Sequence, residues 1–95
     1  MYYCEALDKN VCLCKIKQKQ SFGVAFVDSE TGLYLFPITV PLYTTSRCYS
    51  YIDCAKFPRL VSWLCDNSLI TKTFCFVYKD KKVYEKVKFV KEKVL

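Results

Sequence analysis

The sequence predicts an α+β protein, with a small antiparallel sheet of about four to five strands and one helix packed on one face of the sheet. Three observations favour this class. Short runs alternate with the strand period of two, one pair of apolar runs is separated by a turn sequence, and a single segment has helical spacing. The chain has 95 residues, 53% of them hydrophobic. A chain of this length has room for one core, so we expect residues 1–95 to form a single compact domain.

The first half of the chain is expected to supply three strands. Residues 11–19 alternate in the pattern of a half-buried strand. Residues 22–27 and 33–36 are apolar runs separated by residues 28–32, which begin with Asp and end with Gly and so suit a turn with a left-handed last residue. Residues 22–32 resemble the first hairpin of the connector domain of MutS-type mismatch-repair proteins, and this resemblance implies a hairpin here. Because both arms are apolar on both faces, we expect a central position under a helix or a partner.

The middle of the chain contains a proline-bounded segment and the helix. Pro37 and Pro41 lack a backbone N–H, so residues 39–51 are expected to be irregular or to lie at a sheet edge. Pro58 suits the first turn of a helix, and the apolar residues that follow it share one helical face. These features predict a helix over residues 58–65.

The C-terminal third is expected to return to the sheet. Residues 69–78 predict a strand with Phe74, Phe76 and Tyr78 on one face, where large rings are expected to fill the core. The basic segment 82–95 follows a short turn and fits an antiparallel strand. Its valines also recur at near-helical spacing, so a terminal amphipathic helix remains the alternative.

The sequence predicts no catalytic or metal site. It contains no histidine, which removes histidine-based general bases and His-containing zinc sites. The two glycines are too few for a phosphate-binding loop, and the seven cysteines lack the paired, closely spaced knuckles of thiolate zinc sites. We therefore expect no enzymatic activity, no cofactor, no metal ion and no small-molecule substrate.

The cysteines and the apolar pattern also bear on location. No apolar run approaches the roughly 20 residues that cross a bilayer, and the first residues lack the basic region of a secretory signal. We expect an intracellular protein without a membrane span, in which the thiols stay free and mostly buried.

Three tyrosines in the segment 39–51 suggest the leading function. Tyr43, Tyr49 and Tyr51 lie where regular periodicity is weak, and tyrosine rings at such positions are typical of protein interfaces. We expect a small non-enzymatic accessory or regulatory protein that binds a protein partner, most simply a second copy of itself, so that it forms a homo-oligomer.

A basic nucleic-acid-binding module is the alternative. The formal net charge is +6, and lysines neutralise phosphates and release counterions. The charge is concentrated on one strand and near the C-terminus, so two basic rows would merge if these strands were adjacent. The candidate residues are Lys15, Lys17, Lys19, Lys79, Lys81, Lys82, Lys86, Lys88, Lys91 and Lys93.

Overall fold

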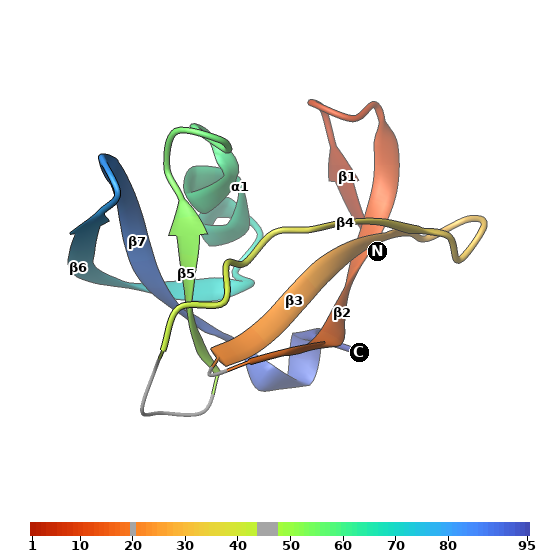
Figure 1. Cartoon of the computed structure of the whole chain (residues 1–95). Helices are drawn as coiled ribbons and strands as arrows, with labels where there is room; N and C mark the ends of the chain where they lie inside the picture. The colour runs from red at the N-terminus through yellow and green to blue at the C-terminus, as the bar shows by residue number, and fades with distance from the viewer. Residues whose placement is uncertain (20, 44–47) are drawn as a thin grey trace.

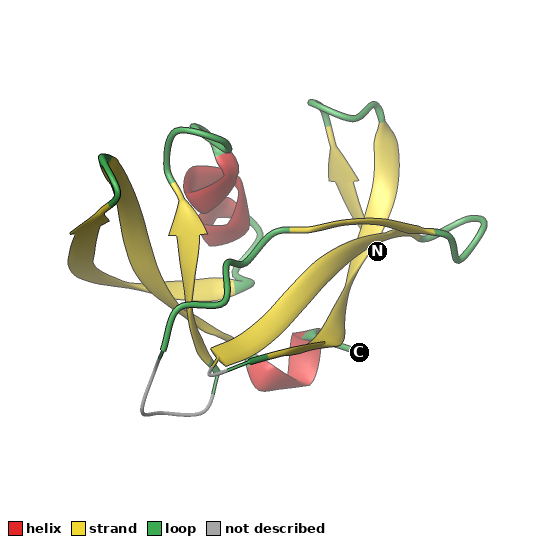
Figure 2. Ribbon diagram, in the orientation of Figure 1, coloured by secondary structure: helices red, strands yellow, loops and turns green. Residues whose placement is uncertain are grey.

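The protein is composed mainly of strands, which form two separate antiparallel sheets (Figures 1 and 2). A computed structural model describes residues 1–19, 21–43 and 48–95. The first sheet has the order β1-β2-β3-β4, and the second has the order β5-β7-β6. The strands are β1 (Tyr2–Cys4), β2 (Lys9–Gln18), β3 (Ser21–Asp28), β4 (Tyr34–Pro37), β5 (Tyr49–Asp53), β6 (Ile70–Lys79) and β7 (Lys82–Phe89), with helix α1 (Leu60–Asp66) and the 3-10 helix η1 (Lys91–Lys93).

The predicted α+β class is confirmed, but the prediction of one sheet with a helix on one face is wrong. β4 ends at Pro37, and the chain leaves the first sheet soon afterwards, since the N–H of Ile38 still donates to the carbonyl of Val24 on β3. The next strand, β5, then pairs with β7, and β7 also pairs with β6. Among the described residues, an isolated bridge between Val40 and Tyr51 joins the segment after β4 to the second sheet.

The N-terminal strands form where the alternating pattern predicts them. Val11 and Leu13 on β2 are buried, whereas the lysines that follow at the same parity are exposed. β3 is an inner strand of the first sheet, and its residues from Gly23 to Phe26 are buried, as its apolar character on both faces predicts. β4, the other arm of the predicted hairpin, is instead the edge of this sheet.

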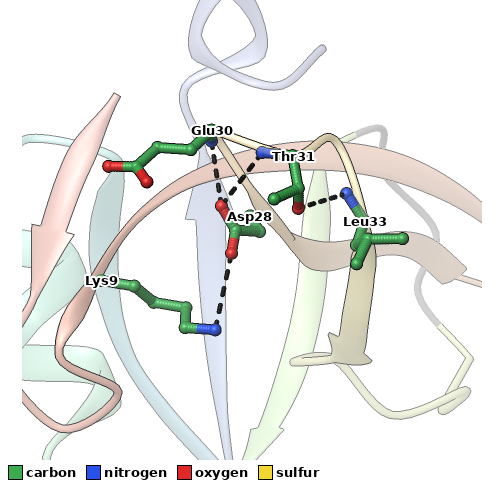
Figure 3. A network of polar contacts seen from close by, with 5 residues as sticks. All are labelled: Lys9, Asp28, Glu30, Thr31 and Leu33. Atoms are coloured by element: carbon green, nitrogen blue, oxygen red, sulfur yellow. Dashed lines mark hydrogen bonds and ion pairs between the residues drawn. The ribbon is translucent and has the colours of Figure 1, made fainter.

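The turn between β3 and β4 is organised by Asp28 (Figure 3). One carboxylate oxygen of Asp28 accepts hydrogen bonds from the N–H groups of Glu30 and Thr31, at 2.9 and 3.3 Å. The other oxygen lies 3.5 Å from the Lys9 ammonium. Gly32 closes the turn with φ +75°, the left-handed conformation that the sequence predicts. These backbone hydrogen bonds, led by that from Glu30, lower the pKa of the Asp28 carboxyl.

Helix α1 lies over the junction of the two sheets (Figure 1). Leu64 is fully buried in a core that also contains Phe26 of the first sheet and Phe89 of the second. The Trp63 ring packs edge-on against Phe26 at 5.6 Å, and its Nε1–H donates to the carbonyl of Tyr3. The helix therefore joins the two sheets through one continuous core.

A second link between the sheets is polar. The Ser50 hydroxyl on β5 is buried and donates to the carbonyl of Phe22 on β3. The Phe22 ring packs against Phe89 with 6.1 Å between ring centroids. These contacts fix the orientation of β5 and determine which face of the second sheet remains open to solvent.

The C-terminal segment 82–95 contains both β7 and η1. β7 has a strict strand period, with Val87 and Phe89 buried and Lys88 between them exposed. After η1, the chain runs beside β2, where Leu95 exchanges backbone hydrogen bonds with Leu13 and Lys15.

The placement of the β6 aromatic residues differs most from expectation. Phe74, Phe76 and Tyr78 were expected to fill the core, but they are 75%, 55% and 73% exposed. Phe76 and Tyr78 lie on the predicted face, because they pair with Glu85 and Val83, which share the face of buried Phe89 on β7. Phe74 lies in a bulge and pairs with no residue of β7. The core ends before the strand does, so only the Ile70 end of this face is covered.

Candidate binding surfaces on the second sheet

The open face of the second sheet combines tyrosines with lysines. Directly paired residues of antiparallel strands share a face, and the register pairs Tyr49 with Lys88 and Tyr51 with Lys86. We call this surface the tyrosine–lysine face. Its members are Tyr49 and Tyr51 on β5, Lys79 on β6, and Lys82, Tyr84, Lys86 and Lys88 on β7.

The tyrosine–lysine face brings together residues that the sequence assigned to two different functions. Tyr49 and Tyr51 were candidates for a protein interface, and they lie on β5, a regular strand at the edge of the second sheet, which fits the edge alternative of the prediction. The lysines of β7 were candidates for nucleic-acid binding. Sequence reasoning missed Tyr84, although it alternates with Lys86 and Lys88, which is the strand pattern that places all three on one face.

Most of the positive charge on this face has no acidic partner. The Lys86 and Lys88 ammonium groups lie over the Tyr49 ring, at 5.0 and 5.7 Å from its centroid. Among the residues that the structure describes, Lys79, Lys86 and Lys88 form no ion pair, whereas Lys82 lies 3.7 Å from a carboxylate oxygen of Asp53. The face is therefore positively charged around partly buried aromatic rings.

Asp53 fixes one end of this face. Its carboxylate accepts hydrogen bonds from the N–H groups of Lys56 and Ala55, at 3.2 and 3.0 Å. These hydrogen bonds lower the pKa of the Asp53 carboxyl, and the bond from Lys56 has the largest effect. The Lys82 ammonium also lowers this pKa. The thiol of the next residue, Cys54, has a raised pKa because of burial and the nearby Glu85 carboxylate. A thiol in such surroundings is a poor nucleophile.

A second surface lies on the outer edge of the same sheet. β6 is an edge strand, and in the described part of the chain its backbone from residue 71 to residue 79 has no hydrogen bonds to any strand except β7. Phe76, Tyr78 and Val83 share the face opposite the tyrosine–lysine face, because Tyr78 pairs with Val83. We call Phe74, Phe76 and Tyr78 the aromatic edge.

A bulge that contains Phe74 separates Phe76 and Tyr78 from the buried end of β6. The register with β7 shifts between Lys72 and Cys75, and Phe74 within this bulge has φ +59°. A bulky residue rarely adopts the left-handed region. Beyond the bulge, residues 75–79 pair regularly with β7.

The remaining candidate residues lie elsewhere. Tyr43 is exposed just before residues 44–47, which lie outside the described parts of the chain. The first basic row is on β2, in the other sheet, so it does not merge with the lysines of β7 through strand pairing. The lysines outside the tyrosine–lysine face are Lys15 and Lys17 on β2, Lys19 after it, Lys81 in the β6–β7 turn, and Lys91 and Lys93 in η1.

All seven cysteines are free, but they are less buried than expected. Cys4 and Cys48 are buried, Cys75 is exposed and the other four are intermediate. Within residues 1–19, 21–43 and 48–95, no group of three or more Cys, Asp or Glu side chains is placed to hold a metal ion. No helix in these ranges is long and apolar enough to cross a membrane.

Comparison with known proteins supplies no family for this chain. No family model matches it, and neither a curated protein nor a solved structure gives a match. The functional argument therefore depends on the two surfaces of the second sheet.

Proposed function

We propose that this chain is a non-enzymatic intracellular interaction protein that associates with a second copy of itself through the outer edge of β6. The observation that carries this proposal is the exposure of Phe74, Phe76 and Tyr78 on an edge strand. Seven free thiols agree with a reducing compartment, and the absence of histidine from the sequence agrees with a binding role.

An edge strand with exposed aromatic rings is a strong template for pairing. Its outward N–H and C=O groups are available to another strand, and soluble proteins normally protect such edges with prolines, charges or short strands. Contiguous exposed apolar side chains mark interaction sites. Phe76, Tyr78 and Val83 form such a group on one face of the β6–β7 hairpin.

The other described sheet edges are poorer templates than β6. β1 has three residues, and β4 has four and ends at Pro37. β5 has five residues, and Val40 already occupies part of its outer side through the bridge to Tyr51. β6 has ten residues, of which 75–79 pair regularly beyond the bulge, and it has no neighbour on its outer side among the described segments.

A second copy fits this edge because antiparallel self-pairing is two-fold symmetric and closes after one partner. If the pairing is centred on Val77, Phe76 of one copy lies opposite Tyr78 of the other, and aromatic cross-strand pairs of this kind are stabilising. The same arrangement places Lys79 opposite Cys75. It keeps the two lysine-containing β6–β7 turns at opposite ends of the paired segment, which limits their repulsion.

The test is the molar mass in solution between about 1 and about 100 µM, measured by sedimentation equilibrium. We expect a concentration-dependent dimer, which Phe76→Lys or Tyr78→Lys converts to a monomer with an unchanged circular dichroism spectrum. Tyr34→Lys is the matched control, because Tyr34 is 56% exposed on edge strand β4 and Phe76 is 55% exposed on β6.

Two results would contradict the proposal. One is a wild-type protein that stays monomeric at the highest concentration. The other is a dimer that withstands both β6 substitutions but dissociates with Tyr49→Ala or Tyr51→Ala, which would place the interface at the tyrosines that the sequence first suggested.

A further inference from the structure

We propose that the tyrosine–lysine face binds single-stranded nucleic acid. This site is independent of the β6 edge, because its side chains lie on the opposite face of the sheet from Phe76 and Tyr78. It supplies two kinds of group that such a ligand needs, which are cations for phosphates and rings for bases.

Lys82 pairs with Asp53, but the other lysines of this face form no ion pair with a described residue. Lys86 and Lys88 are two residues apart on the same face of the central strand β7, and both ammonium groups approach one ring. Lys79 lies directly opposite Lys82 across the β6–β7 pair. Like charges directly opposite in a sheet are destabilising, so a polyanion that neutralises them gains affinity from the relief of this repulsion and from counterion release.

The tyrosines favour a single strand over a duplex. Tyr51 and Tyr84 lie on the two adjacent strands β5 and β7 and are partly buried, which limits the freedom of their rings. Bases stack on such rings only when they are not stacked in a double helix, and this stacking is tolerant of sequence. Phosphates that approach Lys86 and Lys88 would draw these ammonium groups from the Tyr49 ring towards the ligand backbone.

The choice of lysine over arginine predicts little sequence preference. An arginine reads guanine through two fixed hydrogen bonds, whereas a lysine acts as a flexible point charge. Every cation that we assign to this face is a lysine. We expect similar affinities for oligonucleotides of different base composition and a strong dependence on salt.

The experiment is fluorescence anisotropy of the full chain with labelled oligothymidylate and oligouridylate of about 12 nucleotides and a duplex of the same length, titrated at several salt concentrations. The first variant is the double substitution Lys86→Gln and Lys88→Gln. We expect at least about a ten-fold loss of affinity. The negative slope of log affinity against log salt should become shallower by about 1.4, which corresponds to the loss of two phosphate contacts on a single strand.

A matched double substitution, Lys15→Gln and Lys17→Gln, removes the same charge from β2 in the other sheet and should have little effect. Tyr51→Leu and Tyr84→Leu, each expected to weaken binding about five-fold or more, test the stacking contribution without a change of charge. Each variant should keep the wild-type circular dichroism spectrum.

The proposal is overturned if no oligonucleotide binds at low salt, or if the β2 pair matters as much as the β7 pair. Binding to the duplex or to vesicles of anionic lipid that is as tight as binding to the single strand also overturns it, because neither ligand offers bases to the tyrosines. An unaltered affinity in both tyrosine variants has the same consequence.

Discussion

Truncation of two phenylalanines of the second sheet should destabilise the protein by clearly different amounts. Phe89 is 1% exposed and packs in the core against Phe22, so Phe89→Ala should lower the free energy of unfolding by about 3 to 5 kcal/mol. Phe76 is 55% exposed. Its buried part is a little under half of the side chain, and full burial of Phe contributes about 1.5 to 3 kcal/mol, so Phe76→Ala should cost about 1 kcal/mol.

Urea unfolding followed by circular dichroism measures this difference. The samples are diluted until the midpoint no longer depends on protein concentration, so that dissociation of a dimer does not contribute. With a denaturant slope of about 1 kcal/mol/M for a chain of this size, the two variants should differ in midpoint by about 2 M or more. If Phe76→Ala lowers the free energy of unfolding as much as Phe89→Ala, the β6 rings are packed in the core. This result would contradict the proposed β6 interface.

Three further outcomes follow from single residues. Gly23→Ala should destabilise the protein by about 1 to 3 kcal/mol in thermal unfolding, because its new Cβ would lie 2.7 Å from a backbone oxygen of β2, and an unchanged midpoint would contradict this packing. The lowered pKa of Asp53 means that its stabilising contribution is complete above about pH 4 and is lost as the pH falls through the folded-state pKa. Asp53→Asn should therefore reduce stability at neutral pH and flatten its decline in an acid titration, whereas an equally steep decline would count against this role. In the native protein a thiol reagent should modify exposed Cys75 much faster than buried Cys48, and equal rates would refute that difference in burial.

Local patterns in the sequence predict individual elements well where one signal dominates. The alternation of β2, the Asp28 to Gly32 turn and the apolar face of α1 each depend on residues close together in sequence, and the structure contains all three. The pairing of β5 with β7 joins segments about 30 residues apart, and no local pattern specifies it. The antiparallel pairing of β6 with β7 was predicted, but the separate sheet that these strands form with β5 was not.

The sequence also did not show how far the core extends along β6. A period of two identifies which side chains of β6 share a face, and this assignment was correct. It does not say where neighbouring elements stop covering that face. α1 and the first sheet cover the Ile70 end only, so Phe76 and Tyr78 are exposed although they resemble core residues in sequence.

The bulge at Phe74 also bears on aggregation. Apolar segments of six or seven residues with high strand propensity can stack into the dry zippers of amyloid fibrils. The register shift around Phe74 divides the regular pairing of β6 into residues 70–72 and residues 75–79, and each part is shorter than such a segment. We therefore expect β6 to be a poor template for fibril growth, although residues 75–79 offer the edge that we propose for pairing with one partner.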